Sequence, residues 1–163
     1  MNNLKYAVII LTSLFLLNSC SEDSDEQQCP QNEIVSMKIN GEEMQFQVSS
    51  WGIDFDNDGT GYTLELQLTS GIFYPRQASY SITLRLPYKK TGNNILKEIN
   101  YLQVQDTTST EGNFIQAELQ SKIYVNKNSC ISASFSGCTT IDGNEIVISD
   151  GVIKHVYYSP FEN

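Results

Sequence analysis

Apolar and polar residues alternate along most of the chain after residue 33, a pattern that predicts β-strands with one buried face and one face in water. Leu64, Leu66 and Leu68 alternate with polar residues, and the segment 80–86 repeats this pattern until Pro87 ends it. The other segments predicted as strands are 34–39, 44–48, 101–105, 114–125, 131–136, 146–148 and 152–158. The only segment that could form a helix, and a short one, is 94–99.

Turn residues separate these segments and indicate how they connect. Asn40-Gly41 lies between two alternating segments, and this pair is the strongest short-range signal of a β-hairpin because its two positions require a positive φ. About nine short strands separated by turn signals are typical of an antiparallel sandwich or barrel. We therefore predict an all-β fold, an antiparallel β-sandwich that forms a single domain over residues 33–163.

The first 19 residues have the pattern of a cleavable export signal. Lys5 supplies a positive charge, and the apolar run 7–17 that follows is 11 residues long. A lasting membrane span needs roughly 20 apolar residues, so this run is too short to remain in a bilayer. The segment ends in Leu17-Asn18-Ser19-Cys20, which resembles the lipobox of bacterial lipoproteins. This resemblance implies that residues 1–19 are removed as a signal peptide and that the Cys20 thiol, now at the first residue, carries lipid.

A polar linker over residues 20–32 connects Cys20 to the predicted domain. Four of the six residues in 21–26 are acidic. This run resembles the tag that directs lipoproteins of the Bacteroidota to the outer face of the outer membrane, and it implies an anchored protein that faces the cell exterior. A plain solvated linker has the same composition, and the two interpretations are compatible.

The net charge excludes one class of partner. The whole chain has 10 Lys and Arg against 19 Asp and Glu, a net charge of −9, which becomes −10 when Lys5 is removed with the signal peptide. Nucleic-acid affinity comes chiefly from cations that replace phosphate counterions, and the largest basic cluster here is Lys89-Lys90. Nucleic acid is therefore not expected as a partner, and the membrane is expected through the lipid alone.

The two ends of the predicted domain resemble those of small Bacteroidota lipoproteins that carry a β-sandwich. At the start, the resemblance lies in Met37-Lys38-Ile39-Asn40-Gly41. At the end, it lies in the run 131–137 followed by Ile146-Val147-Ile148-Ser149-Asp150-Gly151. In such proteins a first strand opens the domain and a final pair of strands closes it. The resemblance implies the fold and carries no activity with it.

The segment 54–65 fits the pattern D-x-[DN]-x-[DN]-G-x₅-E of an EF-hand calcium loop. Calcium takes about six to eight oxygen ligands, and the match implies these: Asp54, Asp56, Asp58, the carbonyl of Thr60, and Glu65. The flanking segments are predicted as strands, which excludes a helix–loop–helix and places Glu65 on the water-facing side of its strand. The other interpretation is a plain hairpin turn, because turns favour Asp, Asn and Gly. Calcium is the one cofactor that the sequence suggests.

Three cysteines remain besides Cys20, so at most one disulfide can form among them. Cys130 and Cys138 lie on one predicted strand, which places their Cα atoms roughly 26 Å apart, far beyond the ~7 Å limit for a disulfide. Cys29 is therefore the expected partner of either Cys130 or Cys138, and the bond would staple the linker to the domain. No pair of cysteines has the spacing of a zinc site.

Residues that could carry catalysis are sparse. His155 is the only histidine, and a nucleophile needs a base oriented beside it. We therefore expect no enzymatic activity and predict a binding or adhesion role, with a glycan or a protein as ligand. The alternative is an enzyme acting on glycans or peptides, which would require a cleft where His155 meets a carboxylate and a serine. Aromatic residues such as Trp51 could stack on sugars, although strands also favour them for packing.

Overall fold

The computed structural model describes residues 28–56, 59, 61–72 and 78–157, and in these residues eleven strands form two antiparallel sheets that pack face to face. The six-stranded sheet contains, in spatial order, β2 (Glu42–Gln45), β1 (Ile34–Ile39), β11 (Asn144–Val156), β10 (Cys130–Ile141), β9 (Leu119–Asn126) and β6 (Gly92–Asn93). The five-stranded sheet contains β3 (Gln47–Phe55), β4 (Tyr62–Ile72), β5 (Ala78–Pro87), β7 (Glu98–Gln105) and β8 (Thr108–Ile115). The prediction of an all-β sandwich is confirmed, with eleven strands where about nine were predicted.

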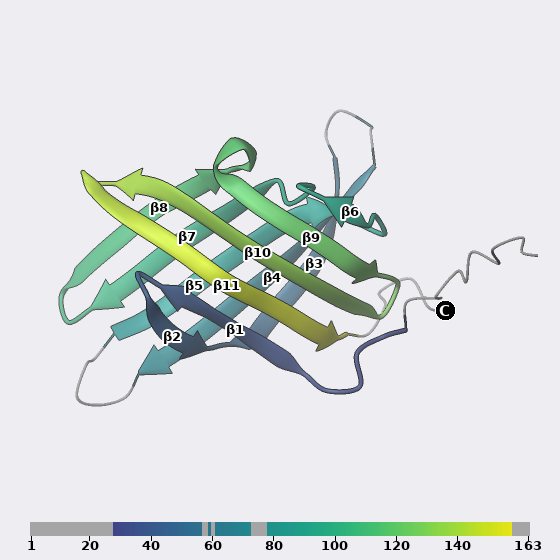
Figure 1. Cartoon of the computed structure of the whole chain (residues 1–163), viewed down its shortest axis with the longest axis horizontal. Coiled ribbons are helices and arrows are strands. Elements are labelled where there is room, and N and C mark those ends of the chain that lie inside the picture. Colours follow the sequence, from purple (N-terminus) through teal and green to yellow (C-terminus); the bar gives the residue numbers. More distant parts are fainter. Residues whose placement is uncertain (1–27, 57–58, 60, 73–77, 158–163) are drawn as a thin grey trace, which may run out of the picture.

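The two sheets cross steeply, so that their strands run along opposite diagonals in Figure 1. Strands that follow one another along the chain are mostly neighbours in space, and the last strand, β11, pairs with the first, β1. The chain passes between the sheets at Phe46, whose backbone N–H donates to the carbonyl of Val35 (2.8 Å), and again at the 3-10 turn η1 (Gln116–Glu118). A crossed arrangement with corners of this kind is one of the two usual ways in which sheets pack.

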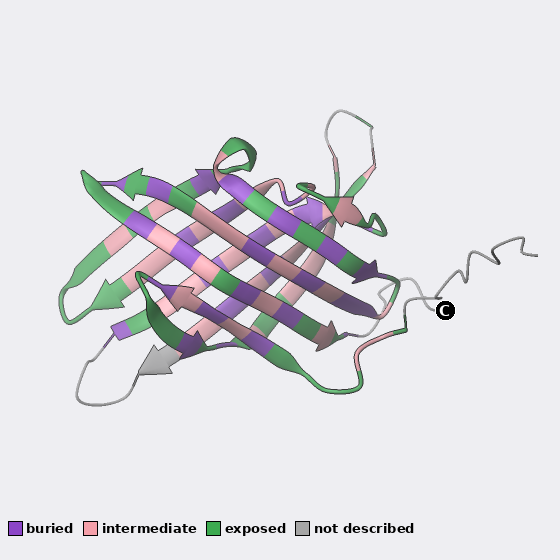
Figure 2. Cartoon of the chain, viewed as in Figure 1, coloured by how far each residue is buried: buried purple, intermediate pink, exposed green. Residues whose placement is uncertain are grey.

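Alternation along the strands produces the core. Leu64, Leu66 and Leu68 are 0% exposed, and they face the apolar residues of the six-stranded sheet across the sandwich. The alternating bands of buried and exposed residues in Figure 2 follow this period along both sheets. Burying a leucine of this size contributes roughly 1.5 to 3 kcal/mol, so these side chains contribute substantially to holding the two sheets together.

The hairpin predicted at Asn40-Gly41 is present and joins β1 to β2. Both residues have a positive φ, 50° for Asn40 and 83° for Gly41, which is the conformation of the two-residue turn that matches the twist of antiparallel strands. The Asn40 side chain also accepts a hydrogen bond from the backbone N–H of Val147 (2.8 Å). The turn residue thereby fixes β1 beside β11.

The short helix considered for 94–99 is wrong. Asn94 has a φ of 54°, outside the helical region, and the backbone N–H of Lys97 donates to the carbonyl of Arg85 on β5 (2.8 Å). Leu96 is buried in the core, and β7 begins at Glu98. Pairing with the neighbouring strand therefore overrides the local pattern. Within the described residues, no helix has the length and apolar character needed to span a membrane.

Three predicted strand boundaries are also wrong. The segment 44–48 is divided at Phe46, where β2 of the six-stranded sheet has ended and β3 of the five-stranded sheet begins. The segment 114–125 is divided by η1 into the end of β8 and most of β9, because the chain changes sheets there. The segments 146–148 and 152–158 belong to the single strand β11, which continues through Asp150 and Gly151 as far as Val156. A shift in pairing register between Phe135 and Gly137 of β10 accommodates the positive φ of Asp150 (51°) within that strand.

Candidate functional site

The predicted calcium ligands that the structure describes lie on the outer side of the β3–β4 hairpin. Asp54 is exposed on β3, opposite Thr63 of β4. Asp56 follows the end of β3, and Glu65 lies two residues beyond Thr63 along β4. The other two predicted ligands, Asp58 and Thr60, lie outside the described residues. The hairpin thus brings three of the predicted residues to one edge of the five-stranded sheet.

Asp56 is held by two groups from the sheet. The Thr63 hydroxyl donates to its Oδ1 (2.6 Å), and the Lys97 ammonium donates to its Oδ2 (3.2 Å). Lys97 also donates to the Thr63 hydroxyl (3.0 Å), so the three side chains form a closed triangle. The Asp56 side chain is only 17% exposed, and a partly buried carboxylate requires such compensation. Lys97 therefore places a positive charge beside one of the predicted calcium ligands.

Glu65 belongs to a second charge network on the same face. The Arg85 Nε donates to its Oε2 (3.0 Å), and an Arg85 terminal nitrogen lies 3.8 Å from the Glu98 carboxylate. These side chains are between 29% and 41% exposed, and exposed pairs of this kind contribute only about 0 to 1 kcal/mol. Glu65 faces water, as its place in the alternation predicts, and pairs with a cation from β5.

The calcium interpretation remains a prediction. Among the described residues, no three His, Cys, Asp or Glu side chains converge closely enough to hold a metal ion, and Lys97 would have to leave Asp56 before a cation could take its place. If calcium binds, millimolar calcium will raise the midpoint of thermal unfolding relative to EDTA, because a ligand that binds only the folded state stabilises it. The shift should increase in Lys97→Met, which removes the ammonium group from Asp56, and disappear in Asp56→Ala. Equal midpoints with calcium and EDTA in wild type and in Lys97→Met would reject the site.

Two hollows flank the tip of the hairpin and share Asp56 and Lys97. One, of about 540 Å³, lies toward Asp54 and Phe55, and the other, of about 480 Å³, lies toward Tyr62 and a short run of lysines. Phe55 is 61% exposed and Tyr62 is 48% exposed, unusually open positions for aromatic rings of this size. The hairpin tip therefore combines exposed rings with charged groups.

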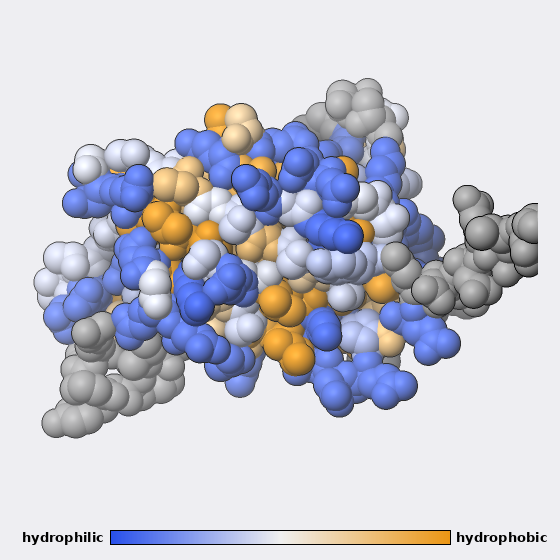
Figure 3. Space-filling model, in the orientation of Figure 1, coloured by the Kyte–Doolittle hydropathy of each residue, from blue (hydrophilic) through white to orange (hydrophobic). Residues whose placement is uncertain are grey.

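A larger groove, about 850 Å³, crosses the outer face of the six-stranded sheet. It spans residues of β6, β9, β10 and β11, and most of its lining carries a hydroxyl or an amide: Asn93, Asn94, Gln120, Ser121, Ser134, Ser136 and Ser149. Val152, which is partly exposed, adds apolar surface. Figure 3 shows this face, where hydrophilic residues surround small hydrophobic areas. We call this feature the outer groove.

Charged and aromatic groups are few around the outer groove and are already engaged. Asp150 accepts a hydrogen bond from the Lys38 ammonium (2.8 Å). The Lys122 ammonium lies 5.1 Å from the centre of the Tyr124 ring, and the Tyr124 hydroxyl is within hydrogen-bond distance of the Ser134 hydroxyl (3.1 Å). Tyr124 is 37% exposed beside the groove. The groove therefore offers paired donors and acceptors next to one open ring.

His155 lies at a different place, where β11 ends. Its Nδ1 is 3.0 Å from the Glu33 carboxylate, and its ring stacks on that of Tyr157. Tyr157 in turn lies 5.0 Å from Trp51 between ring centres, and its hydroxyl donates to the carbonyl of Lys127 (2.9 Å). Burial raises the pKa of the Tyr157 hydroxyl well above its usual value. Glu33 is therefore a carboxylate of the kind that the enzyme hypothesis requires beside His155. The aromatic ring stacked on His155 is that of Tyr157, which itself packs on Trp51.

The structure joins Cys29 to Cys130 in a disulfide, one of the two pairings that the sequence leaves open, with Cα atoms 5.6 Å apart. Cys138 is a free, exposed thiol on β10. Surrounding protein atoms and the Glu145 carboxylate raise the pKa of the Cys138 thiol, which keeps it protonated and poorly nucleophilic. Neither arrangement points to a catalytic cysteine.

Sequence reasoning missed the outer groove and the role of Lys97. The groove is assembled from four strands, and the alternation of β9 and β10 signals an outer polar face but not a hollow in it. Lys97 lies 41 positions after Asp56, in a segment whose pattern suggested a helix. Comparisons with family models, curated proteins and solved structures give no match for this chain.

Proposed function

We propose that the protein is a lipoprotein held by Cys20 at the outer membrane, facing the cell exterior, with a non-enzymatic binding role. The sequence around Cys20 supports the anchor, and the acidic run after it supports the outward face. The described domain supports the same view, because its buried apolar side chains form one core between the sheets. A domain of this kind needs an external anchor to remain at a bilayer.

The outer groove is the ligand site that we propose, and its lining is the observation that carries the proposal. Hydroxyl and amide groups donate and accept hydrogen bonds without a net charge, which suits a neutral ligand rich in hydroxyls. Tyr124 adds a ring face of the kind that packs on sugar rings. A volume of about 850 Å³ accommodates a short oligosaccharide. A glycan is therefore the ligand class that this groove fits best.

Filling the groove tests this proposal. We expect Ser149→Tyr to reduce glycan binding strongly, because the new ring would occupy the groove, whereas Ser81→Tyr on the outer face of the five-stranded sheet should leave binding unchanged. The measurement is a glycan array with the purified wild-type protein, followed by titration of the best ligand against both variants. If both variants bind like wild type, the ligand site is elsewhere. If neither the array nor a pull-down yields a ligand, the binding role itself is rejected.

Metabolic labelling tests the anchor separately. We expect radioactive palmitate to label the wild-type protein and not Cys20→Ser, because the thioether to Cys20 precedes further acylation. The variant should also leave the membrane fraction. A wild-type protein without label, together with a Cys20→Ser variant that still fractionates with membranes, would reject the lipid anchor.

A further inference from the structure

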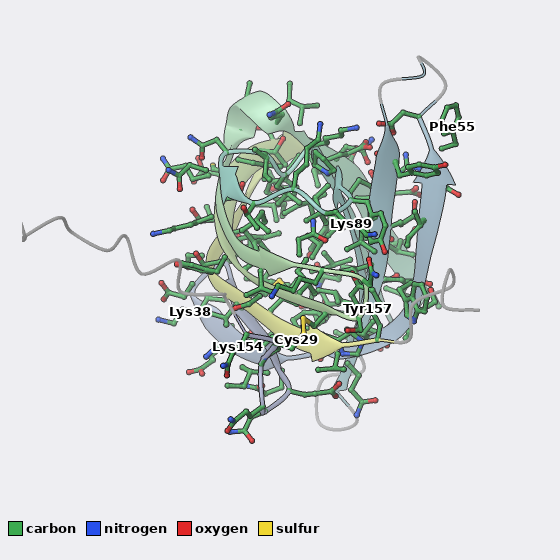
Figure 4. The ribbon with its side chains drawn as sticks, turned by 90° about the vertical axis from the view of Figure 1, so that its right-hand side faces the viewer. Cys29, Lys38, Phe55, Lys89, Lys154 and Tyr157 are labelled. Carbon is green, nitrogen blue, oxygen red and sulfur yellow. A yellow bond between two sulfur atoms is a disulfide. The ribbon has the colours of Figure 1, made fainter. Side chains whose placement is uncertain are left out.

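The linker joins the domain at one end of the sandwich. Cys29 is bonded to Cys130, the first residue of β10, and Cys29 follows Cys20 by nine positions. Nine fully extended residues span roughly 30 Å. A lipid on Cys20 would therefore keep this end of the domain close to the bilayer. We call it the linker end, and Figure 4 views the molecule from the side on which Cys29 and Tyr157 lie.

Hydrogen bonds connect the end of β9, just before Cys130, to the segment 87–90. The side-chain amide of Asn126, at the turn that leads to β10, donates to the carbonyls of Pro87 (2.8 Å) and Lys90 (3.1 Å). Between these two residues, the backbone N–H of Tyr88 donates to the carbonyl of Tyr62 (2.7 Å). Asn126 thus ties the segment 87–90 to the end of β9, and Tyr88 ties it to the start of β4, at the same end of the sandwich as Cys29.

Four exposed residues at this end, Phe55 at the end of β3, Tyr62 at the start of β4, Lys89 and Lys90, form what we call the aromatic-basic patch. The two rings meet edge to face, with centres 5.4 Å apart, and both are largely exposed. Both lysines are exposed, and the Lys89 ammonium lies 5.3 Å from the centre of the neighbouring Tyr88 ring. In Figure 4, Phe55 and Lys89 lie on the same side of the molecule as Cys29.

The chemistry of the patch matches the headgroup region of a bilayer. Aromatic rings favour the boundary between water and hydrocarbon, and lysines close to a surface are attracted to lipid phosphates. Described carboxylates at the linker end include those of Glu33, Asp54, Asp56 and Glu98; Asp56 is paired with Lys97, and Glu98 lies 3.8 Å from an Arg85 nitrogen. The two lysines of the patch therefore share this end of the sandwich with the exposed carboxylate of Asp54, and Asp58 of the same hairpin lies outside the described residues.

We propose that the aromatic-basic patch rests on the headgroups of the same phospholipid bilayer that holds the Cys20 lipid. The inference rests on the proposed function, because the patch is too small to anchor the domain alone. Once the lipid is inserted, the short linker keeps the patch at a high effective concentration near the surface, so weak contacts are sufficient to orient the domain. In this orientation the β7–β8 and β10–β11 hairpins, at the opposite end of the sandwich (Figure 1), point away from the membrane. The outer groove, on a face of the six-stranded sheet, opens to the side.

Quenching by brominated lipids tests this orientation. The lipidated full-length protein is placed in vesicles of phosphatidylcholine and phosphatidylglycerol, with or without bromine on the acyl chains. We expect Phe55→Trp to lose most of its added fluorescence in brominated vesicles. Val104→Trp is the matched control, because Val104 is similarly accessible (38% exposed) near the β7–β8 hairpin at the opposite end. The signal of Trp51 is subtracted with the wild-type protein.

Lys89→Gln together with Lys90→Gln should reduce the quenching at position 55 and leave the lipid anchor intact. A lipidated protein that floats with the vesicles but shows no quenching at position 55, or equal quenching at 55 and 104, overturns the proposed orientation alone. A protein that carries no lipid on Cys20, by mass measurement, and stays in solution overturns the anchor and the orientation together. The two failures are therefore distinguishable.

Discussion

Removing the disulfide by the substitution Cys29→Ala is expected to lower the midpoint of thermal unfolding by roughly 10 to 20 °C. The bond joins residues 101 positions apart, so it closes a loop that includes most of the domain. Closing a loop of about 100 residues removes entropy from the unfolded chain worth about 4 to 5 kcal/mol. The folded contacts of Cys29 are peripheral to the core, so most of this effect arises in the unfolded state. Thermal unfolding followed by circular dichroism measures it.

Two further cysteine variants isolate the cause of that loss. Cys130→Ala should lower the midpoint at least as much as Cys29→Ala, because it opens the same loop and also removes a fully buried side chain. Cys138→Ala should leave the midpoint unchanged, because Cys138 is exposed and unpaired. If the Cys29→Ala midpoint equals that of the wild-type protein, the strands alone fix the domain and the bond serves only to position the linker.

The sheet fold could be predicted from the sequence wherever one face of a strand is buried. β4 and β5 are the clearest cases, because each alternates without interruption and each inward residue from Leu64 to Leu68 is completely buried. The Asn40-Gly41 hairpin could also be predicted, since Asn followed by Gly strongly favours the two-residue turn that requires a positive φ at both positions. Where burial is one-sided and turns are specific, local pattern and final structure coincide.

Prediction failed where a strand has a weak burial pattern or where residues distant in the sequence determine the local structure. Most of β8, over 108–113, is polar and at least partly exposed because it forms one edge of its sheet, so the sequence carries no apolar signal there. The outer groove depends on the curvature of four strands, and no local pattern encodes it. The contact of Lys97 with Asp56 depends on where the sheet places the start of β7. A lysine distant in the sequence therefore lies beside a loop that resembles a calcium site.

Asp150-Gly151 lies between the predicted strands 146–148 and 152–158, and the structure shows why a glycine stands there without ending the strand. Gly151 is buried in the middle of β11, paired with Phe135 of β10. A Cβ atom added to Gly151 would lie 2.7 Å from the Phe135 ring and 2.7 Å from the Phe135 carbonyl oxygen. The glycine is therefore required by the close approach of a neighbouring strand and not by a reversal of the chain.

Gly151→Ala is accordingly expected to destabilise the domain by about 1 to 3 kcal/mol, the usual effect of inserting a methyl group into a packed core. Gly52→Ala is the matched control, because Gly52 also lies within a strand but a Cβ there would meet nothing within 4 Å. That variant should be neutral or stabilising by up to about 1 kcal/mol through the reduced entropy of its unfolded chain. Chemical denaturation measures both free energies of unfolding.

The double variant Gly151→Ala with Phe135→Leu separates the two clashes at this position. Leucine removes the ring edge, yet the Phe135 carbonyl oxygen would still lie 2.7 Å from the new methyl group. That oxygen belongs to the backbone of β10 and can move only if the pairing with β11 moves as well. The second substitution should therefore recover only part of the lost stability. Full recovery would show that the aromatic ring alone requires the glycine, and an unchanged free energy of unfolding in Gly151→Ala would show that the close approach of β10 does not require a glycine at this position.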